Sequence, residues 1–104
     1  MKLERKIILS IETAIDGGSI SIMEDENEID FWKSIKGSLK AEDFLEEVSK
    51  ILDKNKIEKK CIKLITISNE LGNSTGIKIG LSTARGLGRA FNCEVIEVSL
   101  LKAI

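Results

Sequence analysis

The sequence predicts an α/β domain built on a mixed five-stranded sheet with helices on its faces. Three observations indicate this fold class. Apolar residues alternate with polar ones over much of residues 7–35, the period of β-strands, and recur every three to four positions over residues 41–56, the period of a helix. From residue 61 onward, strand and helix patterns alternate, as they do in α/β folds. Because 104 residues suit one domain, we expect residues 1–104 to form a single domain.

The first half of the predicted sheet is antiparallel. Residues 7–23 are expected to form a hairpin, because two alternating segments flank the turn-forming residues Asp16-Gly17-Gly18. A second turn at Asp25-Glu26-Asn27 leads into a third strand at residues 29–35. Within this strand, we expect Trp32 to pack against the fold or to lie half-exposed at the sheet edge rather than to bind a ligand.

The remaining elements alternate between helix and strand. Residues 41–56 predict an amphipathic helix with acids in its first turns and lysines in its last, the order that complements the helix dipole. Residues 61–68 form an almost continuous apolar run, which is typical of a central strand covered on both faces. A glycine-rich helix follows, and residues 94–98 predict a last strand. The apolar stripe of the first helix consists of Phe44, Leu45, Val48, Ile51 and Leu52.

The resulting order, β-β-β-α-β-α-β, is that of the ribonuclease H-like core, which is also the building block of each lobe in the actin-like ATPases. Right-handed crossovers place the first, fourth and fifth strands parallel to one another at the centre of the sheet. The ends of the first and fourth strands, at Thr13 and Ser68, then lie beside each other. Sites of α/β folds lie at this edge of the sheet.

Composition excludes several functional classes. The formal net charge is -1, which gives no general attraction to nucleic acid or to an anionic membrane, so we expect neither as a direct partner. Histidine is absent, and Cys61 and Cys93 lack C-x-x-C spacing, so we expect two buried, reduced thiols and no metal site. The first apolar run is interrupted by Ser10 and Glu12 and is too short for a signal peptide or a membrane span, which predicts a cytoplasmic protein.

The stretch from Gly72 to Gly88 is the least ordinary part of the chain. A loop of glycine and hydroxyl residues leads into a helix whose glycines each cost roughly 0.5–1 kcal/mol relative to alanine. Binding of a phosphate at the helix N-terminus would offset this cost, because backbone N–H groups and the helix dipole attract anions there. We expect no cofactor unless this loop holds ATP or ADP. The loop consists of Gly72, Asn73, Ser74, Thr75 and Gly76. The spacing of these residues differs from the P-loop sequence pattern.

A second interpretation of the same stretch is a close contact between helices. Small side chains recur every four residues and form a groove that lets another helix approach closely. A simpler alternative is that this face packs only on the chain's own sheet and on the helix at residues 41–56. The predicted interface consists of Gly76, Ile77, Gly80, Leu81, Thr83, Ala84, Leu87 and Gly88.

A third interpretation is metal-dependent nuclease chemistry, which needs several carboxylates that converge near the ends of the central strands. Glu12 and Asp16 are candidates beside the first strand, but the fourth strand ends in Ser68-Asn69-Glu70. The sequence therefore predicts no catalytic residue and no enzymatic activity.

The run from Ile65 to Leu87 resembles the signature of the TsaB (YeaZ) proteins, relatives of the TsaD family. The usual form is Gly-Pro-Gly-Ser-Phe-Thr-Gly followed by Leu-Arg-Ile-Gly and Ala-Lys-Gly-Leu. Residues 8–14 resemble the family's strand that ends in Asp-Thr-Ser, with Glu12 in place of the aspartate, and residues 98–104 resemble its Val-Ser-Ser-Leu-Glu-Ala. The residues that match the signature are Gly72, Thr75, Gly76, Ile79, Gly80, Thr83, Ala84, Gly86 and Leu87.

The resemblance implies that these 104 residues are equivalent to one lobe of a TsaB-like protein. TsaB proteins act as scaffolds for TsaD, which carries out the chemistry of threonylcarbamoyladenosine (t6A) formation in tRNA. The resemblance thus implies a non-catalytic scaffold or dimerisation protein, either a homodimer or a heterodimer with a TsaD-like protein. The alternative is a single-lobe protein that binds phosphate or a nucleotide through the Gly72–Gly76 loop.

Overall fold

The computed structural model describes residues 5–12, 18–34, 41–69 and 74–99. Within these ranges the elements follow the predicted order, and a short 3-10 helix at Lys59–Cys61 precedes the fourth strand. The elements are β1 (Ile7–Glu12), β2 (Ser19–Glu24), β3 (Asn27–Lys33), α1 (Ala41–Lys54), β4 (Ile62–Asn69), α2 (Ser74–Phe91) and β5 (Glu94–Ser99).

The five strands form one mixed sheet in the order β3-β2-β1-β4-β5. β2 pairs antiparallel with β1 and β3, whereas β4 pairs parallel with β1 and β5. The predicted parallel alignment of the first, fourth and fifth strands is confirmed. β5 lies at an edge of the sheet, however, and not at its centre, because β1 already pairs with β2 and β4, which leaves β5 to pair with the free side of β4.

Two left-handed residues set element boundaries that differ from the sequence prediction. Asp25 has a φ of 57°, which closes the turn after β2 within two residues, so β3 begins at Asn27. α1 ends at Lys54 because Lys56 has a φ of 54°, and two hydrogen bonds close its last turn: Lys56 N to Asp53 O at 3.1 Å and Ile57 N to Leu52 O at 2.9 Å.

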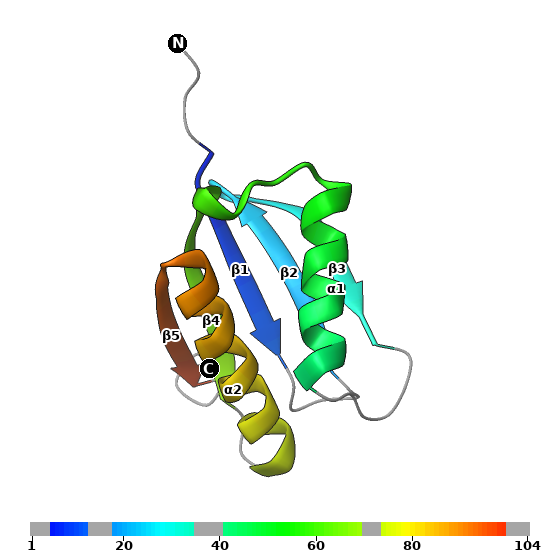
Figure 1. The fold of residues 1–104 in the computed structure, drawn as a ribbon, viewed down its shortest axis with the longest axis vertical. Coiled ribbons are helices and arrows are strands. Elements are labelled where there is room, and N and C mark those ends of the chain that lie inside the picture. Colours follow the sequence, from blue (N-terminus) through cyan, green and yellow to red (C-terminus); the bar gives the residue numbers. More distant parts are fainter. Residues whose placement is uncertain (1–4, 13–17, 35–40, 70–73, 100–104) are drawn as a thin grey trace.

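Both helices lie on the same face of the sheet, α1 over β2 and β3 and α2 over β4 and β5 (Figure 1). The hydrophobic core lies between the helices and this face. In β1, β2 and β4, the strand residues that point toward the helices are almost completely buried, whereas their neighbours in these strands are half-buried or exposed. The prediction that residues 61–68 are covered on both faces therefore differs from the structure, in which the described helices cover one face.

The contact between α1 and the hairpin depends on Gly18. Its φ of 101° suits glycine, and a Cβ added there would lie 2.4 Å from Cζ of Phe44 and 2.6 Å from the carbonyl oxygen of Glu12. Trp32 is half-buried and meets Phe44 edge to face at 6.1 Å between ring centroids, as expected for a packed side chain at the sheet edge.

A polar network joins the segment that precedes β1 to β2, β3 and the end of α1. Arg5 donates to both carboxylate oxygens of Glu24, at 2.7 and 3.0 Å, and to the carbonyl oxygen of Asn55 at 3.3 Å. The side-chain amide of Asn55 in turn donates to Asp30 at 2.8 Å, and Lys54 lies 3.3 Å from the same carboxylate. The hydrogen bond from Arg5 holds the pKa of Glu24 below its usual value, and the bond from Asn55 does the same for Asp30.

Candidate functional site

The ends of β1 and β4 meet at one edge of the sheet, as the sequence predicts. Glu12 is paired with Ser68 in the parallel register, while Thr13 lies outside the described residues. α2 begins at Ser74, shortly after β4 ends, so its N-terminus follows directly from this edge.

The proposed phosphate loop lies mostly beyond the part of the chain that the structure describes. Gly72 and Asn73 are outside it, and Ser74, Thr75 and Gly76 are described only as backbone of the first turn of α2. The phosphate interpretation of this loop therefore stays a prediction.

Carboxylates for metal-dependent chemistry do not gather in the described ranges. Asp16 and Glu70, two of the acids considered from the sequence, lie outside them. Among the residues that are described, no group of three His, Cys, Asp or Glu side chains is close enough to hold a metal ion. In the same part of the chain, no helix is long and apolar enough to cross a bilayer.

Four of the predicted interface residues are buried within the chain itself. Thr83, Ala84 and Leu87 are 2%, 0% and 5% exposed, and Gly88 is also buried. These residues pack toward the chain's own core, as in the simpler alternative that the sequence left open, although Leu87 and Gly88 also line grooves on the surface. The side chains of the other four residues, Gly76, Ile77, Gly80 and Leu81, are outside the described part.

Two glycines of α2 have different surroundings. A Cβ at Gly88 would lie 2.6 Å from Cγ2 of Val95 and 3.3 Å from the carbonyl oxygen of Cys93, so the first residues of β5 pass too close for a side chain. Gly86 is exposed, and among the described residues no atom beyond its own stretch of helix lies within 4 Å of its Cβ position. The fold thus accounts for Gly88, while no described contact within the chain accounts for Gly86.

The outer side of the two helices carries an exposed surface of small and apolar residues. On α2, Ser82, Gly86 and Ala90 recur every four residues and are all exposed. On α1, Leu45 is 41% exposed although the rest of its apolar stripe is buried. A groove of about 200 Å³ runs between the helices, lined by residues that include Leu45, Ser49, Leu87 and Ala90. We call Leu45, Ser49, Ser82, Gly86 and Ala90 the α1–α2 surface.

The exposed row of small residues on α2 differs from the row that the sequence predicts as an interface. The prediction followed the glycines from Gly76 to Gly88, whereas the exposed Gly86 lies about 160° around the helix axis from both Ala84 and Gly88, given 100° per residue. The exposed row contains one glycine, Gly86, and this glycine was the sequence signal that could have identified the row. Gly86 does not fall on the four-residue repeat that contains Gly76, Gly80, Ala84 and Gly88.

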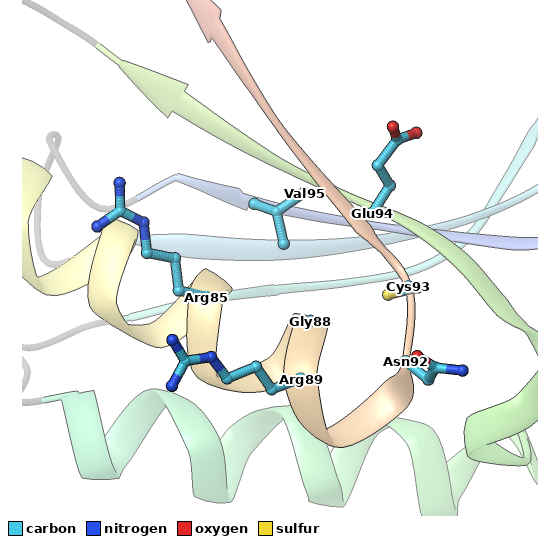
Figure 2. Close-up of a pocket in the computed structure, with 7 residues that line it drawn as sticks. All are labelled: Arg85, Gly88, Arg89, Asn92, Cys93, Glu94 and Val95. Carbon is cyan, nitrogen blue, oxygen red and sulfur yellow. The ribbon is translucent and has the colours of Figure 1, made fainter.

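A second groove, of about 450 Å³, lies between the last turns of α2 and the start of β5. Figure 2 shows Arg85 and Arg89 leaving α2 on the same side, while the carboxylate of Glu94 points away from the helix. Neither arginine forms an ion pair with another described residue. Cys93 also lines the groove, and burial raises the pKa of its thiol, so the thiol is protonated at neutral pH.

The sheet is mixed: β1, β2 and β3 form an antiparallel unit, whereas β1, β4 and β5 are parallel. Together with two helices on one face, this arrangement defines a ribonuclease H-like domain of the type found in actin-like ATPases. Solved structures share this fold. YeaZ from Pseudomonas aeruginosa aligns with a TM-score of 0.79 and 21% identity over 90% of this chain and 44% of its own. A second P. aeruginosa structure, described as an uncharacterised protein similar to the peptidase YeaZ, has the same score and identity, with 43% of its length covered.

Thermus thermophilus RuvC, solved in complex with a Holliday junction substrate, has the same core at a TM-score of 0.60 and 6% identity, over 93% of this chain and 66% of RuvC. The family model that matches is TsaD, tRNA N6-adenosine threonylcarbamoyltransferase, over residues 38–104. The chain therefore belongs to the TsaD family. It spans less than half the length of the YeaZ structures, and no curated protein matches it.

Proposed function

We propose that this chain is a non-catalytic, TsaB-like scaffold that supports t6A modification of tRNA by docking onto a TsaD-like protein. The observation that carries the proposal is the α1–α2 surface. It combines an exposed leucine, Leu45, with a row of small residues on α2 at a groove between two helices. Small residues allow a partner helix to approach closely, and the contact area gained offsets the cost of glycine in a helix.

Gly86 supports this assignment independently of the family. An exposed glycine inside a helix costs roughly 0.5–1 kcal/mol, and at Gly86 the described fold gives no contact in return. A partner helix packed on this surface would occupy the space that a Cβ would take. The glycine is then explained by binding and not by folding.

The charges beside the surface indicate the chemistry of the partner. Arg85 and Arg89 lie one helical turn apart on the exposed side of α2 and lack ion pairs within the described residues. A partner surface with carboxylates at its rim would pair with them, which would favour correct docking over other partners.

The TsaD-like partner would carry out the chemistry. The two thiols are poor nucleophiles in this fold, because Cys61 is buried and burial keeps the thiol of Cys93 protonated. The scaffold proposal needs no cofactor in this chain.

Calorimetric titration with the TsaD-like protein of the same cell tests the proposal. We expect the wild type to bind and Gly86→Leu to lose at least about tenfold in affinity, since the leucine fills the space left for the partner. The open surroundings of Gly86 mean that the variant should still fold. The matched control is Lys50→Leu, an exposed α1 position that faces the side of β3 and should bind normally. Absence of wild-type binding, or equal binding by Gly86→Leu, would contradict the proposal.

A further inference from the structure

The two edges of the sheet differ in how well they resist pairing with a further strand. Edge strands are usually protected by bulges, by lysines or by charges that point toward the core. β3 has all three features: its register with β2 is irregular, Lys33 is exposed, and the carboxylate of Asp30 points toward the end of α1. β3 is therefore a poor template for another strand.

β5 has a more open edge. Its register with β4 is regular throughout, and it contains neither lysine nor proline. Half of its six residues are β-branched, and two of these, Ile96 and Val98, are 43% and 39% exposed. No described strand pairs with its outer side (Figure 1). Pairing with a further strand would satisfy the backbone groups along this edge.

Successive side chains of β5 point to opposite faces of the sheet. Val95 approaches Gly88 of α2, so it points toward the helices, and Glu97 shares this side. Ile96 and Val98 point to the other face. Glu97 is exposed and forms no ion pair with another described residue. An unpaired charge on this side disfavours pairing unless the other chain offers the opposite charge.

The opposite charge lies in the groove beside Val95, which has a volume of about 450 Å³. Arg85 and Arg89 line this groove, and neither forms an ion pair with another described residue (Figure 2). Around the helix axis they lie about 60° and 100° from Gly88, whereas Leu87, which faces α1, lies about 100° away in the other direction. Both arginines therefore project past the outer edge of β5.

Two copies of this chain complement each other at this edge. In an antiparallel pair of β5 strands about a two-fold axis perpendicular to the sheet, the helices of both copies lie on one side, and opposite residues share a face. With Ile96 opposite the partner's Ile96, Glu97 lies opposite the partner's Val95. Glu97 thereby reaches the groove of the partner's Arg85 and Arg89, and the symmetry repeats this contact.

Other arrangements of the two strands are less favourable. A pair centred on Glu97 places two carboxylates directly opposite each other, which is destabilising. A pair centred on Val95 leaves Glu97 beyond the end of the partner's strand. A two-fold axis in the plane of the sheet places the arginines on the face opposite Glu97. In the register centred on Ile96, the two Glu97 carboxylates are diagonal neighbours about 7–8 Å apart, and the arginines of both grooves offset their repulsion.

We propose that this chain self-associates through the outer edge of β5, with Ile96 at the two-fold axis. Glu97 of each copy binds Arg85 and Arg89 of the other, so each groove is complete only when the second copy supplies its carboxylate. Because one strand from each copy forms the contact, the dimer is weak and depends on concentration. The scaffold proposal places carboxylates of a TsaD-like protein at the same arginines, so the two partners compete for them.

Charge exchange tests the contact in the full chain alone. Sedimentation equilibrium from micromolar to millimolar concentration should show a monomer–dimer equilibrium for the wild type. Glu97→Arg and the double variant Arg85→Glu/Arg89→Glu should each weaken it at least about tenfold, because attraction becomes repulsion at two symmetric sites. A mixture of the two variants restores both attractions and should form a heterodimer.

The matched control is Glu94→Arg, which makes the same change of charge in the same strand. Glu94 points away from the helices (Figure 2) and lies opposite the partner's Val98, so this variant should dimerise normally. Three results overturn the proposal: a wild type that is monomeric throughout, a mixture that associates no better than its components, or Glu94→Arg that dimerises as weakly as Glu97→Arg.

Single cysteines test the register. In a Cys93→Ser background, Ile96→Cys should form a disulfide-linked dimer with oxidised glutathione, since opposite Cβ atoms are about 4.5–5.5 Å apart. Val98→Cys is exposed on the same face but lies opposite the partner's Glu94, so it should crosslink far less. Equal or stronger crosslinking through Val98→Cys contradicts the register.

Gly86→Leu separates this proposal from the scaffold proposal. It fills the α1–α2 surface and should lose the TsaD-like protein but keep the dimer, whereas Glu97→Arg should lose the dimer but keep the TsaD-like protein. Circular dichroism establishes that all variants fold. Loss of the dimer in folded Gly86→Leu would place the contact between copies on α2 and contradict the assignment to β5.

Discussion

Replacing each of two α2 glycines with alanine should have opposite effects on stability. At Gly86 the new methyl group enters open space, so the variant gains the helix preference of alanine, about 0.5–1 kcal/mol. At Gly88 the same gain is outweighed, because the methyl carbon would lie 2.6 Å from Cγ2 of Val95. Valine is stiff about χ1 and cannot turn away easily, and overpacking of this kind costs about 1–3 kcal/mol.

We therefore expect Gly86→Ala to be about 0.5–1 kcal/mol more stable than the wild type and Gly88→Ala to be about 1–2 kcal/mol less stable. Urea unfolding followed by circular dichroism gives these differences directly. In thermal unfolding, a loss of 1 kcal/mol lowers the Tm of a domain of this size by about 4–8 °C. Gly88→Ala that is as stable as Gly86→Ala would refute the close approach of β5 to α2.

A double-mutant cycle with Val95→Ala identifies the cause. When the clashing methyl group of Val95 is removed, Gly88→Ala should become neutral or slightly stabilising, since the carbonyl oxygen of Cys93 is 3.3 Å away and requires only a small shift. If Gly88→Ala costs the same in both backgrounds, the penalty does not arise from Val95.

Three further predictions concern the hairpin, the polar network and the loop. Gly18→Ala should cost about 2–4 kcal/mol in urea unfolding, because it combines a φ of 101° with a clash against Phe44; a neutral variant would contradict this packing. The pKa of Glu24 is lowered in the folded state, so its pairing with Arg5 stabilises the fold above the usual value of 4.5 and is lost as the pH falls below it. The stability difference between the wild type and Glu24→Gln should therefore shrink on acidification, and a difference that persists at low pH would argue against the pairing. Calorimetry with ATP, ADP and phosphate should give no heat at millimolar ligand, whereas binding would favour the phosphate interpretation of Gly72–Gly76.

Local patterns predicted most of the fold. The alternation in residues 7–23 and the apolar stripe of α1 fixed the type of each element, because both periods follow from backbone geometry. Element ends were less accurate, since they depend on single left-handed residues. Asp25 lies in the predicted turn, but the sequence does not specify which residue of that turn is left-handed, and Lys56 carries no strong turn signal. The edge position of β5 was also missed, because the order of parallel strands depends on long-range pairing.

The candidate surface was only partly predictable. The sequence indicated that α2 has a small-residue face, but burial of that face depends on where the helix lies on the sheet. The close approach of β5 accounts for Gly88, and the described part of the predicted groove, from Thr83 to Gly88, packs inward, while Gly86 stays exposed. Leu45 belonged to the apolar stripe in the sequence and became exposed because the gap between α1 and α2 is not filled there. Neither outcome follows from the spacing of residues alone.

The most direct test of the scaffold proposal places a photo-crosslinking amino acid at neighbouring positions of α1. Ser49 belongs to the α1–α2 surface, whereas Lys50 points toward β3, and both are exposed. After mixing with the TsaD-like protein and irradiation, we expect a crosslinked heterodimer from position 49 and little or none from position 50. Crosslinking from position 50 alone, or from neither position under conditions in which the TsaD-like protein is folded, would contradict docking through the α1–α2 surface.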